Sequence, residues 1–309
     1  MTEVLTWLFT VEIVGLCVFP LCFFLFPRLK DRGFFITKTV GILAIAYLSW
    51  ILSVFHLLPS VQVVLWGLVV LLGSASWFYG WRIKDEISAF FVKEKGVLLF
   101  GEALFLLVFL TWVLYRTYDS GISHTEQPMD FAFLNSAVRT KAGQPIDPWF
   151  SGHAISYYYF GYWVMATLTK LTSINSAVSY NLALALIPAL GAKGVFGLVY
   201  NVCSSSSKRA RYAVAAGIVS AVLLVAAANA QGALEFMRAN EMGSTTFWEW
   251  VDIEGMTEEL PSLSESWRPA EFLWWWRASR VIRSTQDGEI TDYTIHEFPF
   301  FSFILGDLH

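Results

Sequence analysis

Side chains that can transfer protons or bind phosphate gather in two stretches that lie between long apolar runs. In the first stretch, Asp130 opens a segment whose apolar residues have the spacing of an amphipathic helix, and an acid at a helix start is often only a cap. In the second stretch, Arg277, Arg280 and Arg283 recur every three residues beside a tryptophan cluster. If that segment is helical, its guanidinium groups share one side and either bind a phosphate at headgroup level or simply snorkel.

Three more ionisable residues lie near the end of the sequence. Glu297 precedes an apolar run, and Asp307 and His309 lie within it, where ionisable groups are costly and usually face a cavity or a partner. A carboxylate and an imidazole together suit a divalent cation or a general base, although Asp-Leu-His matches no zinc pattern. Glu12 and Glu102 are also acids within apolar runs, but each stands alone, which favours a structural or interface role.

Composition and missing motifs narrow the class of protein. The sequence is 56% hydrophobic, 17% aromatic and only 15% charged, against about 25% charged in soluble proteins, and this balance predicts an integral membrane protein. No basic stripe indicates nucleic-acid binding. Because the sequence lacks a Walker loop, a GxGxxG turn and a GxSxG elbow, nucleotide-driven transport and serine hydrolysis are disfavoured.

The elements that must position these side chains are membrane spans, each of which needs about 20 mostly apolar residues. We expect six complete spans and a further one that begins near Phe298 and is truncated. The complete spans are predicted at 4–26, 39–58, 61–81, 97–115, 176–203 and 212–231. The sequence thus predicts an all-α polytopic fold in one membrane domain (1–309). Its parts are four spans (1–115), a first outer loop (116–175), two spans (176–231), a second outer loop (232–297) and the start of a further span (298–309).

Basic residues orient these spans. Short loops rich in Lys and Arg lie in the cytoplasm, and three such loops occur at 28–38, 82–95 and 208–211. They place the N-terminus on the extracytoplasmic side of the cell membrane, provided that residues 153–172 do not cross. That segment mixes His153, three consecutive tyrosines and a lysine with apolar residues, as interfacial or re-entrant helices do. We therefore place it as a juxtamembrane helix at the outer surface.

Several motifs resemble the uncharacterised membrane proteins named for their YYY domain, which are grouped with the C-type (GT-C) glycosyltransferase superfamily. The motifs are Pro128-Met-Asp-Phe-Ala-Phe-Leu-Asn135, Asp147-Pro-Trp-Phe150, Ile155-Ser-Tyr-Tyr-Tyr-Phe-Gly-Tyr162, Tyr180-Asn-Leu-Ala-Leu184, Trp275-Trp-Arg-Ala-Ser-Arg280-Val-Ile and Glu297-Phe-Pro-Phe-Phe-Ser-Phe-Ile-Leu-Gly-Asp307-Leu-His309. The resemblance implies a GT-C-like multispan bundle that acts on lipid-linked sugars, with an essential acid and juxtamembrane helices in its first large outer loop. Asp130 matches that acid. Two departures are that four spans precede the loop instead of one, and that the common acid pair is reduced to Asp130 with Glu126 four residues earlier.

On this resemblance we expect a glycosyltransferase that moves a sugar from a polyprenyl-phosphate donor to an acceptor on the extracytoplasmic face. Asp130 would be a general base or metal ligand, and Asp307 and His309 would complete a metal site for Mg or Mn or an acid/base site. Arg277 and Arg280 would steady the lipid phosphate as it leaves. Other side chains are assigned to substrate binding: Tyr157, Tyr158, Tyr159, His153, Trp149 and Glu297.

Two other kinds of protein account for the same residues. A transporter or flippase of a lipid-linked or anionic substrate would use Glu12, Glu102 and the arginines along its path. A noncatalytic membrane scaffold is the third possibility. An enzyme should depend on Asp130, a transporter more on Glu102, and a scaffold on neither. The sequence does not specify an oligomeric state.

Overall fold

The computed structural model describes residues 1–206, 210–227, 230–253, 255–256, 274–287, 289–306 and 308. They form two compact units. The first unit is Met1–Ala221 with Gly306–His309, and the second unit is Val222–Leu305. About 73% of the structure is helical. Four residues used in the sequence-based predictions lie outside the described residues: Lys208, Arg209, Asp307 and His309.

Among the residues that the structure describes, five helices are long and apolar enough to cross a membrane. They are α1 (Thr2–Leu25), α2 (Thr37–Val54, after the 3-10 turn η1 at Phe34–Ile36), α3 (Gln62–Arg82), α4 (Lys84–Tyr118) and α7 (Ser176–Ser206). Their positions agree with the first five predicted spans. A sixth crossing is obtained if Arg211–Ala227 and Gln231–Ala239 form one broken span. The protein is therefore all-α and polytopic.

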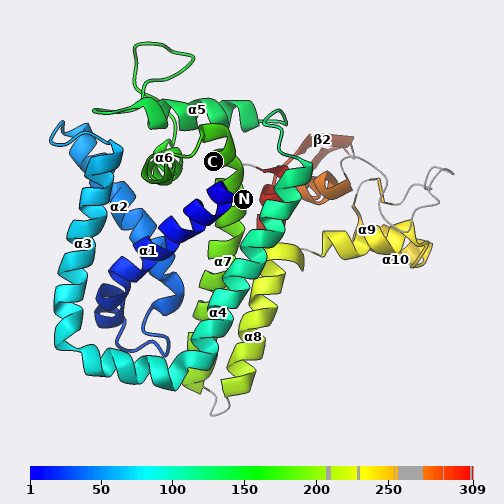
Figure 1. The fold of residues 1–309 in the computed structure, drawn as a ribbon. Helices are drawn as coiled ribbons and strands as arrows, with labels where there is room; N and C mark the ends of the chain where they lie inside the picture. The colour runs from blue at the N-terminus through cyan, green and yellow to red at the C-terminus, as the bar shows by residue number, and fades with distance from the viewer. Residues whose placement is uncertain are drawn as a thin grey trace. The chain divides into compact units, whose positions relative to one another are not determined.

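The long helices of the first unit form two packed groups. α1 packs against α2 and α3, and α4 packs along α7 (Figure 1). The turn η1 contacts helices of both groups. At this point Gly101 of α4 and Gly197 of α7 face the Phe35 ring so closely that a Cβ at either position would overlap it. Small residues allow membrane helices to approach in this way.

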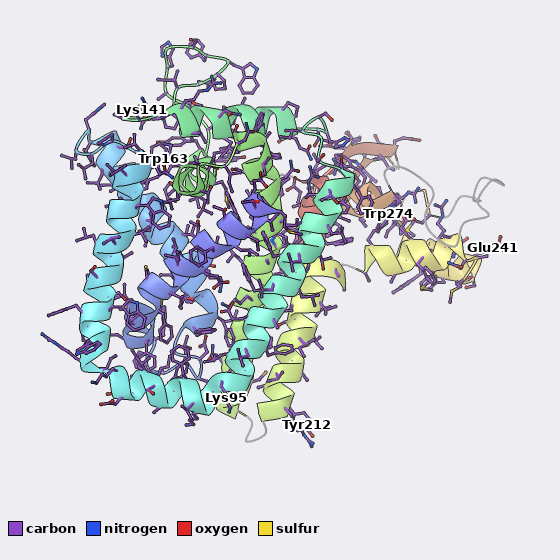
Figure 2. The ribbon with its side chains drawn as sticks, viewed as in Figure 1. Lys95, Lys141, Trp163, Tyr212, Glu241 and Trp274 are labelled. Atoms are coloured by element: carbon purple, nitrogen blue, oxygen red, sulfur yellow. The ribbon has the colours of Figure 1, made fainter. Side chains whose placement is uncertain are left out.

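Two short helices, α5 (Gln127–Arg139) and α6 (Phe160–Thr172), lie at one end of the long helices (Figure 1). Each has 13 residues, fewer than the about 20 that a crossing needs. Proline in the first turn favours the start of α5. α6 is largely covered by its neighbours: Tyr162, Trp163 and Leu168 are buried. Trp163 Nε1 donates to Ser49 Oγ of α2 at 3.0 Å (Figure 2).

The loop between α5 and α6 contains a tight turn. A β-bridge joins Ile146 to Ala154. The Asp147 carboxylate accepts the backbone N–H groups of Trp149 at 2.8 Å and Phe150 at 2.9 Å, so it forms the turn that its neighbouring proline favours. Because residues before Phe160 are used in this loop, the helix expected over 153–172 begins only at Phe160.

The second unit is built from short elements. They are the π-helical turn η2 (Leu223–Ala227), α9 (Gln231–Ala239), α10 (Thr245–Val251), the 3-10 helix η3 (Trp274–Arg280), the antiparallel strands β1 (Arg283–Gln286) and β2 (Glu289–Tyr293), and α11 (Pro299–Leu305). The helix α8 (Ala210–Val222) lies almost wholly in the first unit. Arg277 and Arg280 lie in η3, whereas Arg283 begins a strand. The three arginines therefore do not form the row that one continuous helix would produce.

Candidate acidic site at the end of the helix bundle

Asp130 is completely buried in the first turn of α5. Its Oδ1 accepts the hydroxyl of Tyr162 on α6 at 2.6 Å. Its Oδ2 accepts the backbone N–H of Leu308 at 3.0 Å and lies 3.5 Å from the hydroxyl of Tyr180 on α7. Hydrogen bonds of this kind compensate for removing a carboxylate from water. Side chains or backbone from four separate segments thus meet at one carboxylate.

The segment around Gly306 approaches this site closely. Gly306 has a φ of 72°, a left-handed conformation that favours glycine. Its carbonyl lies 3.2 Å from the Tyr180 hydroxyl. A Cβ at this position would lie 2.7 Å from Gln127 Nε2 and 3.2 Å from Arg116 Nη1. The turn therefore needs glycine both for its conformation and for the space it leaves.

We predicted that the Gly-Asp-Leu-His motif would complete the site at Asp130. Of this motif, the structure describes Gly306 and Leu308. Gly306 and Leu308, which flank Asp307 in the sequence, lie against the Asp130 carboxylate and its tyrosine partner. The side chains of Asp307 and His309 are outside the described residues. Among the residues that are described, no three His, Cys, Asp or Glu side chains gather in a way that could hold a metal ion.

A buried arginine lies beside the Gly306 turn. The side chain of Arg116, at the end of α4, is 3% exposed. Its Nε donates to Asn181 Oδ1 at 2.8 Å, and its Nη1 lies 3.4 Å from the Asp119 carboxylate. The second carboxylate oxygen of Asp119 lies 2.9 Å from His124 Nε2. Arg116 was not predicted as a site residue, because an arginine at the end of an apolar run is usually a snorkelling side chain.

Tyr162 and Tyr180 were also missed as site residues, although both lie in the motifs that carry the family resemblance. A buried tyrosine usually finds a partner for its hydroxyl. This tendency was the one feature that could have suggested a polar partner for each tyrosine. Nothing in a single sequence indicates that the two hydroxyls converge on the same acid. Gln127, which is buried beside Gly306, gave no signal of its own.

An aromatic layer around Phe133 lies next to Tyr162, the partner of Asp130. The Phe133 ring lies 5.4 Å from Trp149, 5.7 Å from Tyr157 and 5.5 Å from Tyr162, measured between ring centres. Tyr157 also lies 4.0 Å from the ring of Tyr158. Hydrogen bonding with Tyr158 raises the pKa of Tyr157 to about 12, so Tyr157 stays a neutral hydroxyl at physiological pH. The predicted residues Trp149 and Tyr157 are thus one ring away from Tyr162, the partner of Asp130.

Other predicted binding residues have local partners. The hydroxyl of Tyr159 accepts Trp50 Nε1 of α2 at 2.9 Å, which fastens the loop to the bundle. His153 stacks on Phe150 at 4.2 Å and is exposed. Tyr158 is 69% exposed. These three side chains lie in or next to the α5–α6 loop, and none of their described contacts is with Asp130.

The predicted arginines and Glu297 belong to the second unit. Arg277 Nη1 lies 2.9 and 3.1 Å from the two carboxylate oxygens of Glu235, a buried side chain of α9. Arg280 Nη1 donates to the carbonyl of Ser279 at 3.1 Å, and its guanidinium carbon lies 4.4 Å from the centre of the Trp276 ring. Glu297 is exposed.

Glu12 and Glu102 do not stand alone, so that expectation is wrong. Lys38 Nζ lies 2.7 Å from the Glu12 carboxylate and 2.6 Å from that of Glu102. The second oxygen of Glu102 pairs with Lys193. The four side chains come from α1, α2, α4 and α7. Lys38, assigned to a cytoplasmic loop by sequence, is instead 2% exposed in the first turn of α2. The cluster joins the two groups of long helices in the first unit.

The first unit thus combines membrane-spanning helices with a buried acidic site at one end, and the protein as a whole is a polytopic membrane protein. A family model described as "Uncharacterized membrane protein (DUF2298)" matches residues 44–309. The chain belongs to this family. Comparison with curated proteins and with solved structures gives no match.

Proposed function

We propose that this protein transfers a sugar from a polyprenyl-phosphate donor to an acceptor on the extracytoplasmic face of the cell membrane. The observation that carries the proposal is the convergence at Asp130. Tyr162, Tyr180 and Leu308 each come from a different motif of the resemblance to C-type glycosyltransferases, and all three contact this carboxylate. Motifs far apart in the sequence thus share one acid.

The reaction needs a group that accepts the proton of the acceptor hydroxyl. In our proposal the acceptor oxygen bonds to the anomeric carbon of the donor sugar, the bond from that carbon to the phosphate oxygen breaks, and the proton passes to Asp130. The polyprenyl phosphate leaves with the bonding electrons. Tyr162, Tyr180 and the Leu308 N–H hold the carboxylate in place. We propose separately that Asp130, Asp307 and His309 would hold a Mg or Mn ion.

The other predicted residues receive binding roles within the same proposal. Arg277 and Arg280 would bind the lipid phosphate, which for Arg277 means exchanging the Glu235 carboxylate for phosphate oxygens. Aromatic faces stack on sugars and prenyl chains, and the Phe133 layer supports this use of Trp149 and Tyr157. The remaining members of the proposed set are Tyr158, Tyr159, His153 and Glu297.

The proposed topology has one membrane domain, with its N-terminus and both long loops outside. This arrangement supports an extracytoplasmic reaction because it brings the α5–α6 loop to the outer side. The short length of α6 supports the proposal that the 153–172 segment does not cross.

The direct test replaces Asp130 by asparagine, which keeps the size of the side chain but removes the base. We expect transfer from radiolabelled polyprenyl-phosphate sugars in isolated membranes to fall about a hundredfold or more, with normal insertion and an unchanged melting temperature in detergent within a few degrees. Asp85→Asn, at an exposed position in the first turn of α4, is the matched control and should keep full activity. If Asp130→Asn transfers sugar normally, Asp130 has no part in the mechanism.

A second function, transport or flipping of a lipid-linked or anionic substrate, is supported by the charged cluster of Glu12, Lys38, Glu102 and Lys193. Ionisable groups within spans often mark substrate or ion paths. Assaying the Glu102→Gln and Asp130→Asn variants in parallel distinguishes the two functions. A transporter should lose flux of fluorescent lipid-linked sugar in proteoliposomes with Glu102→Gln, whereas an enzyme should lose transfer with Asp130→Asn.

A further inference from the structure

The side of α5 that faces away from Asp130 forms one wall of a groove of about 700 Å³. The α5–α6 loop forms the other wall. Its lining combines hydroxyl, amide and charged groups with a few apolar surfaces: Phe131, Ala132, Asn135, Ser136, Arg139, Thr140, Ala142, Gln144, Ile146, Asp147, Pro148 and Ser151. A volume of this size matches typical ligand sites in proteins, which run from about 300 to 1,000 Å³.

The groove and Asp130 lie on opposite sides of α5. At 100° per residue, Asn135 and Arg139 point away from Asp130, Leu134 and Ala137, and the latter three are buried in the first unit. An α-helix with its side chains is about 10–12 Å across. A molecule in the groove therefore cannot touch Asp130 unless it extends beyond the helix.

The loop wall is fixed before any ligand binds. The backbone N–H of Gly143 donates to the Ser53 carbonyl at 2.8 Å, and the Ser53 hydroxyl donates to the Gly143 carbonyl at 3.1 Å. Lys170 Nζ donates to the Thr140 carbonyl at 2.8 Å. These bonds attach the loop to α2 and α6. A wall held in this way loses little conformational freedom on binding.

Several polar groups in the groove remain available to a ligand. Within the part of the chain that the structure describes, the side chains of Arg139, Gln144 and Ser151 have no hydrogen-bond partner. For Asp147, Oδ1 accepts two backbone N–H groups and Oδ2 has no described partner. The free groups include both donors and acceptors, so the groove is not specialised for an anion or a cation.

Mixed donors and acceptors beside apolar faces match the chemistry of sugars, whose hydroxyls both donate and accept while their C–H faces pack on rings. Phe131 and Pro148 supply such faces inside the groove. Trp149 and Phe150, which are 63% and 66% exposed, follow Pro148 in the sequence. A lipid chain would leave the charged groups unpaired. A peptide strand would need free backbone groups to pair with. The backbone N–H of Gly143 already bonds to Ser53, and those of Asp147 and Ile155 bond to carbonyls within the loop.

We propose that this α5 groove is a carbohydrate-binding site that holds a sugar chain of the substrate some distance from the reacting sugar. Its assignment to a substrate rests on the proposed function, whereas carbohydrate binding itself does not. Arg139 and Gln144 donate to sugar hydroxyls, Asp147 accepts from them, and Phe131 packs against a ring face.

The test measures binding of glucose, mannose and galactose tri- to hexasaccharides to the full chain in detergent, by saturation-transfer NMR and thermophoresis. We expect at least one saccharide to bind, and Arg139→Ala and Gln144→Ala each to weaken it tenfold or more. Lys141→Ala is the matched control and should bind normally. This exposed cation lies on the same loop (Figure 2) and is not among the residues that line the groove. The proposal is overturned if no saccharide binds, if the groove variants bind like the wild type, or if only peptides bind.

The outcome is separable from that of the proposed function. Asp130→Asn should lose sugar transfer and still bind the saccharide. If the wild type binds the saccharide but transfers no sugar, the binding site in the groove is supported and the glycosyltransferase function is rejected. If it transfers sugar but binds no saccharide, the function is supported and the binding site is rejected.

Discussion

Two ionisable side chains at the α5 end of the first unit, the buried Asp130 and the half-buried Lys170, are held in different ways. Asp130 has hydroxyl and N–H donors on its two oxygens. Within the part of the chain that the structure describes, the partners of Lys170 are neutral: its Nζ donates to the Thr140 carbonyl at 2.8 Å and to Ser60 Oγ at 3.0 Å, and lies 5.0 Å from the centre of the Trp163 ring. Burial therefore lowers the pKa of Lys170 to about 8.

Because its pKa is lowered, Lys170 makes the free energy of unfolding depend on pH. A lysine that titrates near 8 when folded and near 10.4 when unfolded costs stability while it is charged. The free energy of unfolding should therefore rise as pH goes from about 8 to about 10, by an amount on the order of 2 kcal/mol. Lys170→Met should lack this rise, which is measured as the difference from wild type in detergent. Exposed Lys141→Met is the control, and equal slopes in all three proteins would contradict the prediction.

At the scale of elements, hydropathy predicts the five long helices because each needs only a sufficient apolar run. It does not report which helices meet. Glu12 and Glu102 looked isolated because their shared partner, Lys38, lies between two runs in the sequence and inside α2 in the structure. The start of α6 at Phe160 was also beyond prediction, since it depends on the Asp147 turn. Asp130 was predicted from its motif, but its tyrosine partners were not, because their convergence is a property of three packed helices.

The turn at Gly306 is the element whose sequence requirement is sharpest. Gly306→Ala places a side chain in a left-handed conformation and within 2.7 Å of Gln127. We expect a loss of about 1–3 kcal/mol of stability and a loss of sugar transfer, because the displaced segment carries the Leu308 N–H away from Asp130. Gly161→Ala is the matched control, since nothing lies within 4 Å of its Cβ position. Melting temperature and transfer activity measure the two effects, and wild-type values for both would refute this account of the turn.

At the scale of the whole molecule, the orientation of the protein in the membrane decides which side carries the α5–α6 loop. Length and composition give the number of long apolar helices, five or up to six among the described residues, without a direction. The proposed direction rests on the basic loops, and burying Lys38 in α2 takes one basic residue out of the first of them. The remaining positive charges, including Arg28, Lys30 and Arg32, still favour a cytoplasmic loop.

Cysteine labelling decides the orientation. In a variant whose three native cysteines are replaced by serine, Lys141→Cys should react with a membrane-impermeant maleimide in intact cells. Ser205→Cys, an exposed position at the end of α7, should react only after the membrane is opened. Reaction of Ser205→Cys in intact cells would reverse the topology and place the proposed active site in the cytoplasm.

The contact between Asp130 and Leu308 has a consequence for how the protein is made. These residues are 178 positions apart, whereas Tyr162 and Tyr180 follow Asp130 within one stretch of the chain. At about 5–20 residues per second, a ribosome needs on the order of ten seconds to travel from Tyr180 to Leu308. During that interval the helices that hold Asp130 can already be inserted and packed, with only the tyrosine hydroxyls facing the acid. A nascent chain therefore occupies the membrane before the last contact of its acidic site, the Leu308 N–H, has been synthesised.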